Sequence, residues 1–377
     1  MQIIRFEIDG LLGRSQRTEM SVSSDLGLLT GRNGAGKTSI LKLLWAIVSG
    51  NIMVALDEVN FQRAHIVTSD YECTLHRLGR RTCKVEITIE GKTTLYEDLA
   101  DEDDDIVINA EDEANSVLRA IGSSVFFPTF RRIEGGFTIS TSRNLNNSLQ
   151  RQFRAKNELE DAMLTLSRTL THNTHVFVSS ISTADIVALL LRQYADFSEI
   201  ANILQADTSQ KIIQRIKNLN LRGDEAERLE SATGVLEEVR SSIEQMEISR
   251  QDIMAPMDEV RELVERLFQN TGIRFGPRLS FGDAANAINS DVLSAGEKQM
   301  LSFVCYNAFY KDSIIFIDEP ELSLHVDWQR QLFSILHRQQ STNQFIVATH
   351  SPFIYTKYQD KELSILGDRG DDVEHDS

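Results

Sequence analysis

Two short stretches decide the fold of this chain, Gly31-Arg-Asn-Gly-Ala-Gly-Lys-Thr38 and, far downstream, Ile314-Ile-Phe-Ile-Asp-Glu-Pro320. The first has the spacing G-x-x-x-x-G-K-S/T of a loop that binds phosphate groups. An apolar segment at 26–30 precedes this loop and an apolar helical pattern at 39–48 follows it, which is the strand–loop–helix context that the loop requires. The second stretch is an apolar run that ends in two adjacent carboxylates. Together they predict a site for a nucleoside triphosphate.

The predicted phosphate-binding loop combines several groups that suit an anion. Its glycines can take backbone angles that other residues avoid, so that successive N–H groups turn toward phosphate oxygens. The helix that follows presents the positive end of its dipole to the same place. Lys37 adds a full charge near the β and γ phosphates, and the hydroxyl of Thr38 is suited to Mg²⁺. The predicted nucleotide-binding residues of this loop are Asn33, Gly34, Ala35, Gly36, Lys37, Thr38 and Ser39.

The downstream stretch predicts the second half of the site. The bulky apolar residues at 314–317 are typical of a central parallel strand that is covered on both faces. Asp318 then lies at the carboxyl end of that strand, where open α/β sheets bind their ligands. We expect Asp318 and Thr38 to hold Mg²⁺. Glu319 projects in a different direction, and we expect it to orient the water that attacks the nucleotide.

Three further segments point to the same kind of site. Residues 293–299 read Leu-Ser-Ala-Gly-Glu-Lys-Gln before a helical pattern, which places Ser294 and Gly296 at a helix start, a natural site for an anion. Residues 344–348 predict another buried strand, and His350 follows that strand directly in Thr-His-Ser-Pro. Between them, Glu-Leu-Ser-Leu-His at 321–325 leads into an amphipathic helical pattern.

In this order, the motifs resemble those of the ATP-binding-cassette (ABC) ATPases over roughly residues 1–50 and 280–366. The resemblance implies that ATP is the nucleotide and that two copies form a head-to-tail dimer or part of a higher homo-oligomer. Ser294 and Gly296 of one subunit would then touch the γ-phosphate of the ATP that the other subunit holds. Residues 323–325 would cross the dimer interface.

The same resemblance assigns two catalytic residues and leaves one position open. It implies that His350 contacts the γ-phosphate and acts in catalysis beside Glu319. The family also places a glutamine on a loop after an early strand. The corresponding stretch here, Val125 to Phe137, contains no glutamine, so the sequence leaves this residue of the magnesium site unidentified.

Within that family the chain resembles a group of AAA ATPases (AAA_15 and AAA_21) whose heads are interrupted by helices. This group includes RecF-like, chromosome-maintenance (SMC) and overcoming-lysogenization-defect (OLD) ATPases. Phe126-Phe-Pro-Thr-Phe-Arg-Arg132 and Ala348-Thr-His-Ser-Pro352 look like segments of ATPase subunits of bacterial anti-phage defence systems. Several OLD relatives carry a nuclease domain after the ATPase, but only 27 residues follow His350 here. The resemblance therefore implies an effector, a nuclease or a toxin, that is encoded separately.

The predicted fold is α/β, an ABC-ATPase head with a mixed sheet, helices and an N-terminal antiparallel β lobe, interrupted by a helical insertion. Residues 71–97 alternate like antiparallel strands, with turns at Gly79-Arg80 and Glu90-Gly91-Lys92. We expect residues 1–146 to form the N-terminal half of the head with the β lobe. Residues 147–270 are expected to form the insertion, and residues 271–377 the C-terminal half of the head.

The predicted insertion carries two helical patterns. Apolar residues recur at helical spacing over 183–204, and residues 224–253 show a heptad repeat. Pro256 predicts a break, after which 257–268 resume a helix. A compact helical bundle and a short coiled-coil hairpin that meets partners both remain open. The two predicted seams of the heptad are Leu229, Leu236 and Ile243, and Ala232, Val239, Met246 and Ile253.

Composition and charge limit the class of protein. With 377 residues, 41% hydrophobic and 25% charged, the chain is typical of a soluble globular protein with more than one lobe. It has no apolar stretch long enough for a membrane and no signal peptide, so we expect a cytoplasmic location. Its three cysteines argue against a disulfide framework, and Cys73, His76 and Cys83 lack a fourth ligand for a zinc site.

Charge is unevenly distributed along the chain. The net charge is −17, but residues 97–113 hold ten acidic residues and no basic one, and residues 368–377 have a net charge of −4. The remainder is close to neutral, and residues 131–157 are basic, with six Arg and Lys residues against one Glu and with phenylalanines between them. That stretch either meets phosphates or pairs with acidic residues of the head, so nucleic acid remains a possible partner.

Two functions from different classes follow. The first is a soluble ATPase that acts as a sensor or scaffold and controls a separate effector in anti-phage defence. The alternative is a RecF- or SMC-like ATPase of DNA repair or genome maintenance that binds DNA. The nucleotide-binding half of a transporter is disfavoured, because 255 residues separate Thr38 from Ser294 and no glutamine follows the early strand.

Overall fold

The computed structural model describes residues 1–100, 106–129, 132–133, 162–163, 165–181, 183–218, 225–267, 294–339 and 341–365. The chain divides into two compact units. The first is Met1–Ser182 together with Asp291–Ser377, and the second is Thr183–Ser290. The first unit, which we call the head, contains every residue of the predicted nucleotide site, so that site can be described within one unit.

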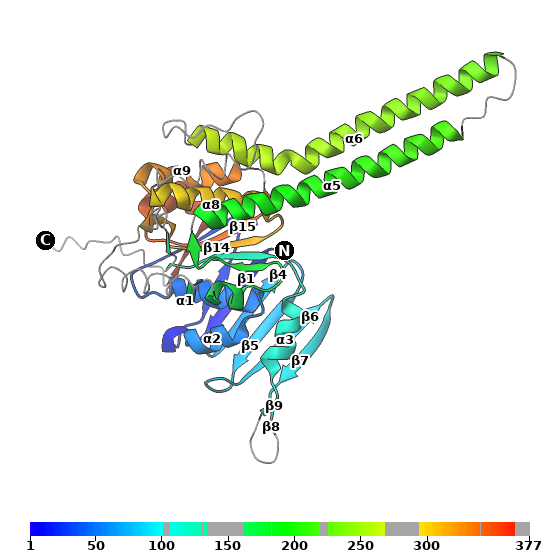
Figure 1. Ribbon diagram of the computed structural model, residues 1–377. Helices are drawn as coiled ribbons and strands as arrows, with labels where there is room; N and C mark the ends of the chain where they lie inside the picture. The colour runs from blue at the N-terminus through cyan, green and yellow to red at the C-terminus, as the bar shows by residue number, and fades with distance from the viewer. Residues whose placement is uncertain are drawn as a thin grey trace, which may run out of the picture. The chain divides into compact units, whose positions relative to one another are not determined.

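A six-stranded parallel sheet forms the centre of the head (Figure 1). Its middle strands are buried along their whole length, as expected for a parallel sheet that is covered on both faces. Because the strands are parallel, the carboxyl ends of strands that are far apart in sequence lie side by side. In spatial order the strands are β12 (His175–Phe177), β10 (Ser124–Phe127), β14 (Ile314–Asp318), β15 (Gln344–Ala348), β3 (Leu26–Thr30) and β16 (Glu362–Ser364).

Aromatic residues join helices to both faces of this sheet. On one face, Trp45 of α1 (Lys37–Val48) stacks on Phe126 of β10 with ring centroids 5.0 Å apart. On the other face, Phe127 meets Phe303 of α8 (Ala295–Phe309) edge to face at 4.9 Å. Neighbouring residues of a strand point to opposite faces, so β10 is held between two helices. Helices α9 (Val326–His337) and α10 (Pro352–Tyr355) complete the C-terminal half.

A second, antiparallel sheet forms the predicted N-terminal β lobe. The predicted strands over 71–97 and the first strand are confirmed, and two strands that were not predicted, β2 and β4, complete the sheet. Helices α2 (Ile52–Glu58) and α3 (Ala110–Leu118) lie in the same half of the head. In spatial order the strands are β2 (Thr18–Ser21), β1 (Ile3–Asp9), β4 (Arg63–Thr68), β5 (Glu72–Arg77), β6 (Cys83–Ile89) and β7 (Lys92–Glu97).

Strands β12 and β13 (Ser180–Ile181) change the predicted limits of the insertion, and two short ribbons add to the head. β8 (Leu99–Ala100) pairs with β9 (Ile106–Ile108), and β11 (Arg132–Ile133) pairs with β13. Strands β12 and β13 lie within the stretch that was predicted to be helical, and β12 extends the central sheet. Three-residue strands show no periodicity in sequence, and pairing with β10 supplies the stability that local propensity does not. The head therefore continues beyond residue 147.

The second unit contains two long helices, α5 (Thr183–Lys217) and α6 (Glu225–Leu267), that pack on each other as a hairpin (Figure 1). In the described part of this unit the arrangement is a two-helix hairpin rather than a compact bundle. The predicted break at Pro256 is wrong, because α6 continues through it. Proline removes one backbone donor, but α6 has 43 residues and continues on both sides of Pro256.

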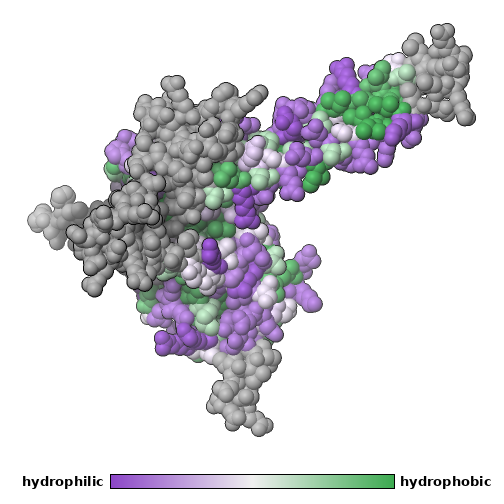
Figure 2. Space-filling view, viewed as in Figure 1, coloured by the Kyte–Doolittle hydropathy of each residue, from purple (hydrophilic) through white to green (hydrophobic). Residues whose placement is uncertain are grey.

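The two predicted heptad seams differ in their exposure. Val239 and Met246, with Ala232 and Ile253, are half-buried, as a seam requires. The other seam is wrong, because Leu236 is 69% exposed and Ile243 is 47% exposed. The half-buried positions beside the first seam are instead Val235, Ser242 and Ser249. A contact between two helices covers only a narrow stripe of each, so a second apolar row stays in solvent, and apolar side chains gather on the hairpin surface in Figure 2.

Several sequence features fall outside the described residues. These are residues 101–105 of the acidic segment, the acidic end at 368–377 and the basic stretch 131–157 apart from 132–133. Cys73, Cys83 and Cys305 are buried and free. Among the described helices, none is both long enough and apolar enough to cross a membrane.

Candidate functional site

The predicted phosphate-binding loop joins β3 to α1, as the motif requires. Gly34 and Gly36 have φ angles of 78° and 102°, in the left-handed region that favours glycine. The Nζ atom of Lys37 donates to the backbone oxygens of Gly31 at 2.8 Å and Arg32 at 3.2 Å, so the lysine folds back over the loop. Burial lowers the pKa of Lys37, and nearby carboxylates oppose this shift. The lysine is thus placed to exchange loop carbonyls for phosphate oxygens.

An arginine that was not predicted from the sequence, Arg14, also binds the backbone of this loop. Arg14 donates from Nη1 to the oxygen of Ala35 at 2.7 Å and from Nη2 to the oxygen of Gly34 at 2.8 Å. It directly follows the short 3₁₀ turn Leu11–Gly13. A guanidinium that holds two carbonyls of the loop fixes the backbone at the place where N–H groups would meet an anion. No sequence motif marks this arginine, because only the fold brings it to the loop.

Asp318 meets the loop helix across 280 residues of sequence. Thr38 Oγ1 donates to Asp318 Oδ1 at 3.0 Å. The other oxygen, Oδ2, accepts from Thr129 Oγ1, and Asp318 is completely buried. Thr129 lies in the stretch from Val125 to Phe137, where the family would place a glutamine. Two hydroxyls and one carboxylate form the set of hard oxygen ligands that suits Mg²⁺.

Glu319 and His350 lie close together at the ends of β14 and β15. His350 Nε2 is 3.8 Å from Glu319 Oε1, and the backbone N–H of Glu319 donates to Ala348 O at 2.8 Å. Glu319 has φ 48° and ψ 63°, a left-handed conformation that costs about 1–2 kcal/mol for a non-glycine residue. Burial and the charge of Lys37 lower the pKa of His350, while Glu319 raises it. The pair can therefore hold or move a proton beside the loop.

Ser294 and Gly296 belong to a different group of residues. Ser294 caps α8, where Glu297 N donates to Ser294 Oγ at 3.3 Å and Ser294 N donates to Glu297 Oε2 at 2.7 Å. A Cβ atom on Gly296 would lie 2.5 Å from the backbone oxygen of Ser323. Both residues line an open hollow with Ser323, His325 and Trp328. The fold thus joins residues 294–297, which we call the signature-like segment, to residues 323–325. Lys37, Thr38, Asp318, Glu319 and His350 form the first group.

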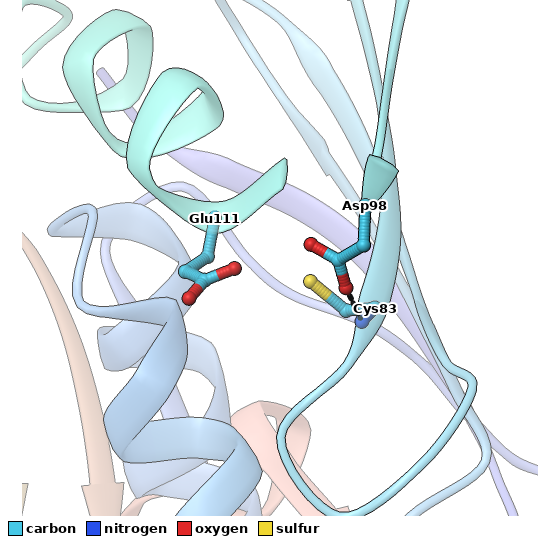
Figure 3. A group of neighbouring side chains, drawn as sticks. All are labelled: Cys83, Asp98 and Glu111. Carbon is cyan, nitrogen blue, oxygen red and sulfur yellow. Dashed lines mark hydrogen bonds between the residues drawn. The ribbon is translucent and has the colours of Figure 1, made fainter. Parts of the chain in front are cut away.

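A separate cluster of side chains lies in the β lobe, where Cys83, Asp98 and Glu111 face one another within 4.8 Å (Figure 3). Both Asp98 oxygens already accept backbone N–H groups, from Cys83 and from Ala110, each at 2.8 Å. Burial raises the pKa of the Cys83 thiol to about 12 and also raises the pKa of Glu111. Asp98 therefore links β6 to the start of α3, and the cluster does not use Cys73 or His76.

Solved structures with similar folds include three SMC head domains. One is the Smc head domain with an extended coiled coil, bound to the C-terminal domain of ScpA, from Pyrococcus furiosus (TM-score 0.36, 11% identity, 94% of this chain and 91% of that chain). Another is the SMC head domain from Thermotoga maritima (0.36, 12%, 94% and 92%). The third, with a coiled coil and joint, is from Pyrococcus yayanosii (0.37, 11%, 94% and 93%).

A family model identifies the family of this chain. A search among curated proteins found no match. The model of the AAA ATPase domain, by contrast, matches residues 1–355, which is most of the chain and includes the loop, Asp318, Glu319 and His350. The chain therefore belongs to the AAA_15 family of AAA ATPase domains, and its enzymatic activity is the hydrolysis of ATP.

Proposed function

We propose that this ATPase closes as a head-to-tail homodimer around ATP and Mg²⁺ and that its nucleotide state controls a separate effector protein. One observation carries the proposal. The loop, Asp318, Glu319 and His350 form one group, whereas Ser294 and Gly296 lie in an open hollow with residues 323–325. A second copy of the chain would bring that hollow to the nucleotide.

In this proposal the magnesium ion is held by Thr38 and Asp318, with Thr129 as an additional ligand or positioning group. Asp318 is buried, and both of its oxygens contact hydroxyls. When bound, Mg²⁺ would neutralise phosphate charge and orient the phosphates. The side chain of Thr129 can turn from a donor to Asp318 into an acceptor toward the ion, because a hydroxyl has both capacities.

The chemical step would depend on positioning and charge. Lys37 and the N–H groups of the loop would stabilise the β and γ phosphates. Glu319 would accept a hydrogen bond from the attacking water, and His350 would donate to the γ-phosphate. The 3.8 Å separation of Glu319 and His350 leaves both side chains within reach of one phosphate group.

The dimer would be completed by the start of α8. Ser294 is an N-cap residue, and the first N–H groups of a helix favour an anion. Gly296 allows the backbone of residues 323–325 to approach it closely. Hydrolysis would then open the interface, because the γ-phosphate is the group that both subunits share.

Control of an effector is supported by the hairpin. Leu236, Ile243 and several isoleucines of α5 are exposed, and such apolar rows are typical of surfaces that meet proteins. Together with the resemblance to ATPases of anti-phage systems, this favours a nuclease or toxin as the partner. The three cysteines are free, which is consistent with a cytoplasmic location.

DNA binding is the alternative function, and the basic stretch 131–157 favours it. This function predicts binding whose affinity falls steeply with salt in the presence of ATP. The discriminating experiment purifies the tagged full-length chain with its genomic neighbours co-expressed, with and without ATP. Nucleotide-dependent recovery of one neighbouring protein supports the effector. Recovery of DNA, with salt-sensitive affinity and no protein partner, would support the alternative.

A further inference from the structure

A half-buried carboxylate, that of Glu321, connects the segment after Glu319 to the segment that carries His350. Glu321 Oε1 accepts the backbone N–H of His350 at 2.5 Å, and Glu321 Oε2 accepts the hydroxyl of Thr349 at 2.9 Å. Burial raises the pKa of Glu321, while these hydrogen bonds lower it. Both oxygens are therefore engaged by the residues that follow β15.

Gln329 of α9 makes a second tie between the same two segments. Its Nε2 donates to Leu324 O at 2.8 Å and is 3.3 Å from Glu321 O, while its Oε1 accepts from Ser351 Oγ at 2.6 Å. Two side chains from different elements thus connect residues 321–324 to residues 349–351. A displacement of one segment must break these bonds or move the other segment.

The start of α8 holds residues 320–324 on their other side. Gln299 Nε2 donates to Pro320 O at 2.9 Å. Gly296 leaves no room for a Cβ atom, which would lie 2.5 Å from Ser323 O. Residues 320–324 are therefore packed between the signature-like segment and the segment of His350, and little free space remains to absorb a shift.

We infer that Glu321 is a positioning residue that fixes His350 against Glu319. With Gln329 it makes residues 320–324 a stiff link between the start of α8 and the catalytic pair. Contact of Ser294 with a nucleotide on a partner subunit would then be transmitted to the subunit's own His350. This last step rests on the proposed dimer, whereas the positioning role within one head does not.

The test separates hydrogen bonding from bulk packing by two substitutions. In Glu321→Gln, the amide oxygen can accept the N–H of His350 while the amide nitrogen donates to Thr349 Oγ1, which can accept. This variant should keep kcat within about threefold of wild type. Glu321→Ala leaves both donors without their acceptor, and we expect kcat to fall about tenfold or more while the KM for ATP changes less than about threefold.

Two further measurements distinguish positioning from unfolding. Affinity for a fluorescent ATP analogue and the midpoint of thermal unfolding should stay near wild type in Glu321→Ala. Glu113→Ala, on the exposed face of α3, is the matched control and should leave all quantities unchanged. If Glu321→Ala does not fold, Gln329→Ala tests the second tie and should lower kcat about threefold to tenfold without loss of affinity.

The following results would contradict the positioning role of Glu321. Wild-type kcat in Glu321→Ala, or equal loss of kcat, affinity and stability, would remove the positioning role. A Glu321→Gln variant as impaired as Glu321→Ala would also remove it, because the hydrogen bonds can be satisfied there. Light scattering with ATP tests the dimer separately. A wild-type protein that stays monomeric refutes the link to a partner subunit, but a kcat defect in Glu321→Ala would still support positioning within one head.

Discussion

Replacing Thr129 by valine tests whether the stretch without a glutamine still contributes to the magnesium site. Thr129 Oγ1 donates to one oxygen of Asp318 and Thr38 Oγ1 to the other, and Asp318 is completely buried. Valine has nearly the shape of threonine, so Thr129→Val removes the hydroxyl with little change in packing. The Oδ2 atom of Asp318 then loses the hydrogen bond from Thr129, and the ion loses the hydroxyl that we propose as an additional ligand or positioning group.

The size of the effect follows from the loss of a group that would hold or orient the ion. Mutation of a residue that positions a metal ligand typically lowers metal affinity by about 10- to 100-fold. We therefore expect Thr129→Val to need at least about tenfold more Mg²⁺ for half-maximal binding of ATP. Thr129→Ser keeps the hydroxyl and should remain within about threefold of wild type.

The assay is a Mg²⁺ titration of the binding of a fluorescent ATP analogue, with ATP hydrolysis measured in parallel. Binding without Mg²⁺ should be equal in wild type and both variants, because Lys37 and the loop are unchanged. An unchanged or tighter Mg²⁺ requirement in Thr129→Val would refute the reasoning. Equal losses in the valine and serine variants would also refute it, since only one of them lacks the hydroxyl.

The remaining predictions concern four positions. Lys37→Ala should abolish ATP binding in a filter or fluorescence assay, because it removes the fixed cation of the loop; retained affinity would contradict the site. Glu319→Gln should bind ATP but hydrolyse it at least about a hundredfold more slowly and accumulate a dimer in light scattering, whereas normal turnover would show that another group orients the water. Ser294→Arg should block that dimer in the Glu319→Gln background while the thermal midpoint stays unchanged. Burial lowers the pKa of His175 to about 4, below the ordinary value of about 6.5. The contribution of His175 to the free energy of unfolding is constant above pH 6.5. Between pH 6.5 and 4 only the unfolded chain binds the proton, so the free energy of unfolding falls by at most about 1.4 kcal/mol per pH unit. His175→Gln should flatten the pH dependence of the free energy of unfolding between pH 7 and 5, and an unchanged slope would contradict the assignment.

The sequence predicted those parts of the site whose residues are neighbours in the chain. The spacing of glycines before Lys37 predicts a loop, and an apolar run before Asp318 predicts a buried strand, because each pattern depends on a few neighbouring residues. The confirmed strands β3, β14 and β15 all carry such patterns. The strands that were missed, such as β12, are too short to show a period, and they form because a neighbouring strand pairs with them.

By itself, then, the sequence determined that the chain binds phosphate groups on an α/β head with a β lobe and a helical interruption. Only the tertiary structure decided that Thr129 shares Asp318 with Thr38, that Arg14 holds the loop and that Glu321 holds His350. These are single contacts between side chains or carbonyls that lie far apart in sequence. A hydroxyl, a guanidinium or a carboxylate can bond many partners, so its role is set by which groups the folded chain places within about 3 Å of it.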